Sequence, residues 1–118
     1  MRLMAFTTTT KQFCNRTKTV TRRLGWHDLQ AGEILCGIEK GQGLKKGEHV
    51  KRLGQIQVVS THWEPLCRMT DDLEYGFQET VLEGFPELSP KQFVSFFCLA
   101  DRCTPDVTVN RIEFKYID

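Results

Sequence analysis

The stretch from residue 15 to residue 23 constrains the fold of this chain most strongly. It reads Asn-Arg-Thr-Lys-Thr-Val-Thr-Arg-Arg and holds four cations, three threonines and no acid. Threonine alternates with lysine, valine and arginine, which is the period of a β-strand. On an ideal strand Thr19 and Thr21 face one side, and Lys18 and Val20 face the other. The stretch therefore predicts a strand with a basic rim that binds an anion or takes part in chemistry.

Length and composition are typical of one globular domain covering residues 1–118. Apolar residues make up 40% of the chain and charged residues 26%, which is ordinary for a soluble protein. No apolar run approaches the ~20 residues that a membrane span needs, and residues 1–6 are too short for a signal peptide. We therefore expect a cytoplasmic protein with no membrane partner, and the sequence predicts no particular oligomeric state.

Charge is distributed unevenly along the chain, although the net charge is only +1. Residues 1–27 contain six cations and no acid, whereas residues 64–106 contain nine acids and three cations. One interpretation is that the basic segment contacts an anionic ligand such as a nucleotide or a short RNA. The other is that the two segments attract each other within the fold, and charge alone leaves both open.

Five cysteines are present, and none forms a CxxC pair. An odd count with no such pair favours free thiols over a disulfide framework. Zinc binding through Cys98 and Cys103 is the alternative, although their spacing is wide for zinc ligands. The chain also lacks the sequence motifs of nucleotide-binding loops, serine hydrolases, zinc proteases and zinc deaminases. We therefore predict neither a metal nor a cofactor.

Strands and helices are predicted from periodicity and from residues that begin or end them. The clearest helix start is Ser89-Pro90, an N-cap serine followed by proline. One face of the helix that follows carries Phe93, Phe96, Phe97 and Ala100. We interpret this face as core rather than as an aromatic binding site. Gly54 predicts a bulge within the longest strand. Strands are expected at 3–6, 33–39, 50–61 and 108–117, and helices at 11–14, 72–83 and 90–100. This order predicts an α+β domain with a curved mixed sheet or small β-barrel.

Two further features carry alternative interpretations. Residues 40–49 contain three glycines and three lysines, including Lys45 and Lys46. They form either a flexible surface loop or a mobile basic loop beside a ligand site. Trp26 is either a core residue or a platform on which a base stacks.

Lys18 and Thr21 are the candidates for chemistry. A partly desolvated lysine near other cations has a depressed pKa and can accept a proton. The neighbouring Arg16, Arg22 and Arg23 would supply that field. A hydroxyl beside such a base is an activated nucleophile. The competing interpretation is a solvated sheet surface, and positions three apart on an ideal strand face opposite sides.

The chain resembles the ASCH domain family. Residues 16–22 (Arg-Thr-Lys-Thr-Val-Thr-Arg) resemble its K-T-x-T-x-R strand, and residues 29–35 (Leu-Gln-Ala-Gly-Glu-Ile-Leu) resemble its L-x-x-G-[DE] turn. Residues 83–85, the helix around 93–97 and the closing 112–114 segment extend the resemblance over nearly the whole chain. The loop at 41–46 and the Cys98 to Pro105 segment are similar to small ASCH proteins encoded by bacteriophages, which would place this protein in a host cytoplasm.

That resemblance implies a PUA-like β-barrel with flanking helices and a cleft for RNA or a modified nucleoside or nucleotide. One ASCH branch hydrolyses the acetyl amide of N4-acetylcytidine with a lysine, a threonine and a glutamate. Carried over, these are Lys18, Thr21 and Glu83, with Glu79 and Glu87 as rivals for the acid. Thr21 would attack the carbonyl, Lys18 would take its proton and Glu83 would orient Lys18.

Other ASCH proteins bind RNA or cleave it, so family membership does not determine the reaction. The alternatives are a non-catalytic RNA- or nucleotide-binding module, a metal-independent ribonuclease and an accessory protein that binds a host protein. In each nucleic-acid interpretation the expected ligand contacts are Arg16, Arg22, Arg23, Trp26, Lys45 and Lys46.

Overall fold

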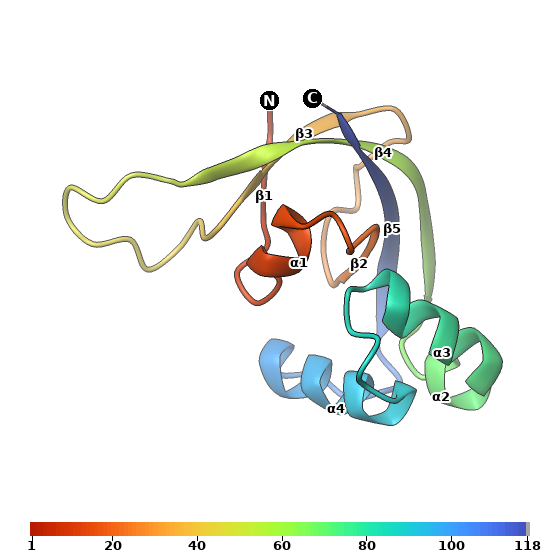
Figure 1. Ribbon diagram of the computed structural model, residues 1–118. Coiled ribbons are helices and arrows are strands. Elements are labelled where there is room, and N and C mark those ends of the chain that lie inside the picture. The colour runs from red at the N-terminus through yellow and green to blue at the C-terminus, as the bar shows by residue number, and fades with distance from the viewer. Residues whose placement is uncertain (118) are drawn as a thin grey trace.

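The computed structural model describes residues 1–117, which form a five-stranded mixed sheet and four helices (Figure 1). The strands are β1 (Leu3–Ala5), β2 (Val20–Arg23), β3 (Ile34–Ile38), β4 (Arg52–Pro65) and β5 (Thr108–Ile117). The helices are α1 (Thr10–Cys14), α2 (Arg68–Asp71), α3 (Leu73–Leu82) and α4 (Pro90–Asp101). This architecture confirms the predicted α+β class.

The strands follow the order β1-β3-β4-β5-β2. Strands β1 and β3 are parallel, and the other neighbouring pairs are antiparallel. The sheet curves around α1 (Figure 1), and the Arg23 side chain at the end of β2 donates a 2.7 Å hydrogen bond to the carbonyl of Ala5 at the end of β1. This side-chain link joins the two edge strands where a barrel would have a backbone ladder. The sheet is therefore open, and the predicted closed barrel is not confirmed.

Two irregularities accompany the curvature of the long strand β4. Its register against β3 shifts beside Gly54, where Gly37 pairs with Gly54 but Ile38 pairs with Arg52. This shift confirms the predicted bulge. A second shift, at Val59 against β5, has no glycine to signal it.

Buried apolar residues form two clusters. The first lies inside the curved sheet and includes Phe6, Phe13 and Phe114 among its members, with ring centroids of Phe6 and Phe13 4.6 Å apart. The second lies among the helices and includes Phe93 and Phe97. Because the two clusters are separate, the contact region between the sheet and α4 belongs to neither of them.

Helix α4 begins as its sequence predicts. The Ser89 hydroxyl accepts a hydrogen bond from the backbone N–H of Gln92, and the Gln92 side chain accepts one from the backbone of Ser89. Helix α3 begins within the range predicted for it, and the Asp72 carboxylate before it accepts a hydrogen bond from the backbone N–H of Tyr75. No helix was predicted where α2 lies, since a single turn is too short for apolar periodicity to reveal it.

The basic stretch is only partly a strand, so the prediction of a strand over all of residues 15–23 was wrong. Strand β2 begins at Val20. Before it, Thr17 and Lys18 donate their backbone N–H groups to the carbonyl of Gln12, and Thr19 donates to the carbonyl of Leu82. These bonds anchor the segment to α1 and to the end of α3. Because Lys18 precedes the strand, strand alternation does not separate it from Thr21.

All five cysteines are free thiols. Within residues 1–117, no group of three or more His, Cys, Asp and Glu side chains is placed to hold a metal ion. No helix in the same range is long and apolar enough to cross a membrane.

Gly76 explains how α2, α3 and α4 pack so closely. A Cβ at this position would overlap the carbonyl oxygen of Met69 in α2 and would lie 2.7 Å from the ring of Pro90 in α4. A glycine inside a helix normally costs about 1 kcal/mol relative to alanine. Here the close approach of two other helices requires it.

We expect Gly76→Ala to lower the free energy of unfolding by roughly 1–3 kcal/mol, because overpacking outweighs the gain in helix propensity. Urea denaturation followed by circular dichroism measures the change. Gly25→Ala is the matched control, since a Cβ there meets no atom of the described residues within 4 Å. A Gly76→Ala protein as stable as the control would contradict this packing account.

Candidate functional site

Arg22 lies at the centre of a buried network of charges between β2 and the helices. Its side chain is 0% exposed. One terminal nitrogen, Nη1, lies 2.9 Å from Glu83 Oε2, and the other, Nη2, lies 2.6 Å from Glu79 Oε1 and 3.3 Å from Glu64 Oε2. A guanidinium presents several donors in a fixed plane, which allows it to contact three carboxylates at once.

Further cations and a phenol complete the network. Arg111 on β5 donates two hydrogen bonds to Glu79, and Arg68 on α2 donates to Glu64 at 3.1 Å. Tyr75 donates its hydroxyl to Glu64 at 2.8 Å. Burial opposes ionisation of Glu79, but the hydrogen bonds from Arg111 and the charge of Arg22 outweigh it and hold the pKa of Glu79 below its ordinary value. The network therefore keeps its charges in a buried environment.

Glu83 connects this network to Lys18. The Lys18 ammonium lies 2.6 Å from Glu83 Oε1 and 3.0 Å from the Glu83 backbone carbonyl. Both side chains are only 3% exposed. Desolvation by burial outweighs the attraction of Glu83, and the neighbouring Arg23 and Arg22 add repulsion, so the pKa of Lys18 is lowered. A lysine with a lowered pKa loses its proton more readily than one in water.

Gly84 allows this pair to form. Its φ is +93°, and a Cβ on it would lie 2.8 Å from Gln12 Cγ and 3.3 Å from Lys18 Cβ. The end of α3 can therefore approach the backbone around Lys18, and this approach is reinforced by the hydrogen bond from Thr19 N–H to the Leu82 carbonyl at 2.9 Å. A residue other than glycine would separate Glu83 from Lys18.

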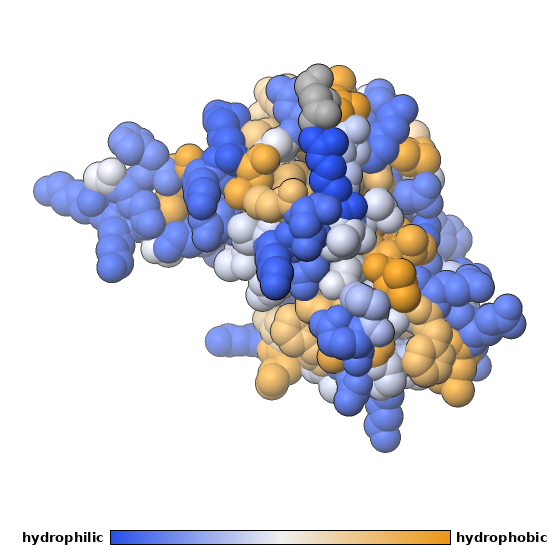
Figure 2. All heavy atoms as spheres, in the orientation of Figure 1, coloured by the Kyte–Doolittle hydropathy of each residue, from blue (hydrophilic) through white to orange (hydrophobic). Residues whose placement is uncertain are grey.

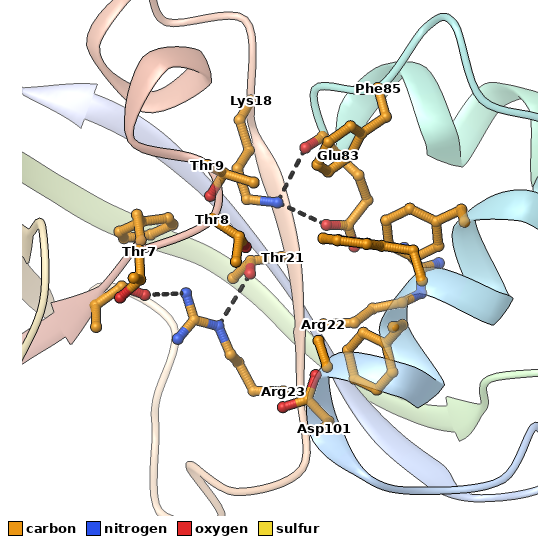
Figure 3. A pocket seen from close by; sticks show the side chains of 16 residues that line it. Thr7, Thr8, Thr9, Lys18, Thr21, Arg22, Arg23, Glu83, Phe85 and Asp101 are labelled. Atoms are coloured by element: carbon orange, nitrogen blue, oxygen red, sulfur yellow. Dashed lines mark hydrogen bonds and ion pairs between the residues drawn. The ribbon is translucent and has the colours of Figure 1, made fainter. Parts of the chain in front are cut away.

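A pocket of about 290 Å³ opens beside the Lys18–Glu83 pair, at the junction of sheet and helices. Figure 3 shows the Lys18 ammonium and the Thr21 hydroxyl on the same wall of this pocket. Arg23 and Asp101 lie farther along it, and Thr7, Thr8 and Thr9 line it on the side away from Glu83 and Phe85. We call this cavity the lysine pocket.

Thr21 is held by Arg23 rather than by Lys18. The Arg23 Nε donates a 3.0 Å hydrogen bond to the Thr21 hydroxyl oxygen, and among the described residues Lys18 makes no hydrogen bond to Thr21. Burial lowers the pKa of Arg23 to about 10 against the attraction of Glu83 and Asp101, so the side chain stays cationic near neutral pH. A cationic donor on the hydroxyl oxygen stabilises the charge that develops if Thr21 loses its proton.

An aromatic wall faces these polar groups. Phe85 and three phenylalanines of α4, together with Phe6, line the lysine pocket; those of α4 are Phe93, Phe96 and Phe97. Phe93 and Phe97 are buried in the helical cluster, which confirms them as core residues. Phe96 is 37% exposed. The prediction that this face of α4 is core alone was therefore wrong, because a pocket separates part of the face from the sheet and Phe96 lines that pocket.

The predicted site residues fall into several groups. The lysine pocket collects Lys18, Thr21, Arg22, Arg23 and Glu83. The rival acids lie elsewhere: the carboxylate of Glu79 is paired with Arg22 and Arg111, and Glu87 is exposed outside the pocket.

The remaining predicted ligand contacts lie outside this pocket. Trp26 lies beside a neighbouring cavity together with Arg23. Arg16 is near the Tyr116 ring, 5.4 Å from its centroid, by a third cavity. Lys45 and Lys46 are exposed in the connection between β3 and β4. The predicted ligand-binding set is therefore spread over several surfaces.

Some residues of the site could not be identified from sequence. Glu64 and Tyr75 belong to unremarkable local patterns, and only the tertiary fold brings the end of β4 and the first turn of α3 to Arg22 on β2. Asp101, in the last turn of α4, lines the pocket, and burial raises its pKa while Arg23 opposes the rise. The excess of acids in residues 64–106 was the available signal, since Glu64, Glu79 and Glu83 pair with cations of the basic segment. The interpretation that the two segments attract each other is thus confirmed.

Comparisons with known proteins support the fold and leave the chemistry open. No protein-family model matches the chain, and no curated protein matches it. Among solved structures, it is similar to protein EF3133 from Enterococcus faecalis V583, which is described by the family model DUF984. The two share 14% sequence identity with a TM-score of 0.61, over 100% of this chain and 77% of the other. At that identity the similarity shows a shared fold only.

We expect Arg22→Met to lower the free energy of unfolding by roughly 3–5 kcal/mol at neutral pH, because it removes the cation that three buried carboxylates share. Arg68→Met is the matched control, since Arg68 also pairs with Glu64 but its side chain is 44% exposed, and it should cost about 1 kcal/mol or less. Chemical denaturation measures both. Equal losses would show that the network does not depend on Arg22.

Proposed function

We propose that this protein is an ASCH-domain amidohydrolase with a PUA-like fold, and that it acts on an N4-acylated cytosine nucleoside such as N4-acetylcytidine. The observation that carries the proposal is the convergence of Lys18, Thr21 and Glu83 at one pocket with an aromatic wall. The motif at residues 16–22 supports the family. The sheet is curved, and its edge strands meet through the hydrogen bond from Arg23 to Ala5. This curvature supports the proposal of a PUA-like, barrel-related fold.

The shape and polarity of the lysine pocket suit a flat, polar base. Phe85 and Phe96 offer apolar surface against which a pyrimidine ring can pack. Lys18, Thr21 and Arg23 would face the exocyclic amide. The pocket volume of about 290 Å³ is at the lower end of the range for small-molecule sites.

The reaction would proceed in two stages. The neutral amine of Lys18 takes the proton of Thr21 as the hydroxyl oxygen attacks the acetyl carbonyl, and the C–N bond then breaks as the exocyclic nitrogen receives that proton. This step leaves an acetyl ester on Thr21 and releases cytidine. In the second stage water attacks the ester carbonyl while Lys18 takes a proton from it, the bond to the Thr21 oxygen breaks as that oxygen receives the proton, and acetic acid leaves and ionises to acetate.

Glu83 and Arg23 would position the reacting groups. Glu83 holds the Lys18 nitrogen through a 2.6 Å contact and is fixed on its other oxygen by Arg22. Arg23 holds the Thr21 oxygen at 3.0 Å. Among the described residues, no direct hydrogen bond joins Lys18 to Thr21. Proton transfer between them therefore requires a bridging water or a rotation of one side chain when substrate binds.

A non-catalytic RNA- or nucleotide-binding module is the second candidate. It is favoured by the tight pairing of Lys18 with Glu83, which could serve the fold alone, and by the exposed lysines between β3 and β4. Binding through phosphates would weaken steeply with added salt. A ribonuclease would instead cleave RNA without metal in a reaction that depends on Lys18.

We expect the wild-type protein to convert N4-acetylcytidine to cytidine, and Thr21→Ala and Lys18→Ala each to lower kcat/KM by about 10²–10⁴-fold. Chromatography of the nucleosides measures the conversion. Thr17→Ala is the matched control, because Thr17 is exposed and its hydroxyl bonds to Asn15 outside the pocket. Absence of cytidine, or equal activity in the Thr17 and Thr21 variants, would refute the proposal.

The pH profile should report the ionisation of Lys18. Its folded-state pKa is lowered from the ordinary value of 10.5, and only the neutral amine accepts a proton, so kcat/KM should rise with pH through that lowered pKa and then level off. Glu83→Gln removes the carboxylate that favours the ammonium form, and should shift the rising limb to lower pH. A profile that falls over this range would contradict the assignment of Lys18 as the base.

A further inference from the structure

A second and larger cavity adjoins the lysine pocket. It measures about 690 Å³ and lies between the edge strand β1, Trp26 and the start of the connection between β3 and β4. That connection, residues 39–51, projects from the body as an arm (Figure 1) and is covered largely by hydrophilic residues (Figure 2). We call the cavity the arm pocket.

The charge of the arm pocket differs from that of the lysine pocket. The lysine pocket is lined by cations together with the carboxylates of Glu83 and Asp101. Among residues 1–117, the arm pocket is lined by the cations Arg23 and Lys40 and by no carboxylate. Thr7 and Gln42 add neutral donors to its lining. This composition favours an anionic ligand group with several acceptor oxygens.

Arg23 lines both pockets, as do Ala5 and Thr7. The Arg23 guanidinium is fixed by hydrogen bonds from Nε to Thr21 and from Nη2 to Ala5, and it lies 5.0 Å from the centroid of the Phe6 ring. Within residues 1–117, its Nη1 nitrogen has no hydrogen-bond partner. An oriented cation at the boundary of the pockets therefore retains donors for a ligand that extends from one pocket to the other.

We propose that the arm pocket is a phosphate subsite, so that the ligand is a phosphorylated nucleotide whose base occupies the lysine pocket. The proposal rests on the proposed function for the identity of the base. Arg23 contacts the phosphate at the boundary and Lys40 contacts it from the base of the arm. Because Arg23 also holds Thr21, a bound phosphate reinforces the orientation of the hydroxyl.

Lys40 provides a test that leaves the lysine pocket intact. It is 40% exposed and lies 3.6 Å from Glu48. Lys51 is the matched control, because it lies on the same arm, is 3.8 Å from Glu39 and does not line the arm pocket. Each substitution by alanine removes one lysine that faces one acid, so the change in net charge is the same.

The experiment compares N4-acetylcytidine with its 5′-monophosphate, its 3′-monophosphate and a short single-stranded RNA carrying the same base, by calorimetry and by turnover. At least one phosphorylated form should bind about tenfold more tightly than the nucleoside. Lys40→Ala should remove most of this gain without altering nucleoside affinity, and Lys51→Ala should preserve it. A gain for the RNA but for neither monophosphate would identify a phosphodiester as the source, and would still support the subsite if it depended on Lys40.

The outcomes separate this inference from the proposed function. Turnover of all forms with equal affinity would overturn the phosphate subsite and leave the hydrolase proposal standing. Tight binding of a phosphorylated form that depends on Lys40, without hydrolysis, would support the subsite and refute the hydrolase. A gain that Lys40→Ala and Lys51→Ala reduce equally would overturn the subsite, because general charge attraction would explain it. Failure of every ligand to bind would overturn both.

Discussion

The pairing of one buried guanidinium with three buried carboxylates organises this molecule. Arg22 comes from an edge strand, whereas Glu79 and Glu83 come from α3 and its end, and Glu64 comes from the end of β4. Removing one partner from such a network destabilises the fold far more than the net contribution of the ion pairs to stability suggests, because the remaining charges stay buried. The network therefore determines where the helices sit against the sheet, and the lysine pocket is the space left at that junction.

The same network connects structure to chemistry through a single side chain. Glu83 accepts from Arg22 on one oxygen and from Lys18 on the other, so the rigid ion cluster holds the amine that we propose as the base. Burial lowers the pKa of that amine, and Arg23 orients the hydroxyl of Thr21 from the opposite side. Positioning of this kind, by groups that are themselves held in place, is what a catalytic site requires.

Local sequence signals predicted much of the fold but not how its parts meet. Ser89 and Pro90 begin a helix because capping is a short-range effect, and Gly54 marks a bulge because of its backbone freedom. The extent of β2 was misjudged because tertiary hydrogen bonds to Gln12 and Leu82 override the alternating pattern. The approach of the two edge strands, β1 and β2, likewise depends on a long-range contact, the hydrogen bond from Arg23 to the Ala5 carbonyl.

The candidate site shows the same division. Lys18 and Thr21 were recognisable from their spacing and basic surroundings, and Glu83 from resemblance to a family. Glu64, Tyr75 and Asp101 were not, since their roles arise only when distant segments meet. The phenylalanines of α4 follow a core-like period that is the same whether the face meets other side chains or a pocket.

The most direct test of the account is a crystal structure of the Thr21→Ala protein with N4-acetylcytidine. We predict that the cytosine ring packs against the Phe85 and Phe96 wall, with the acetyl carbonyl carbon beside the position of the missing hydroxyl and the Lys18 nitrogen still held by Glu83. A nucleoside bound away from the lysine pocket, or with its acetyl group directed away from Lys18 and residue 21, would contradict it.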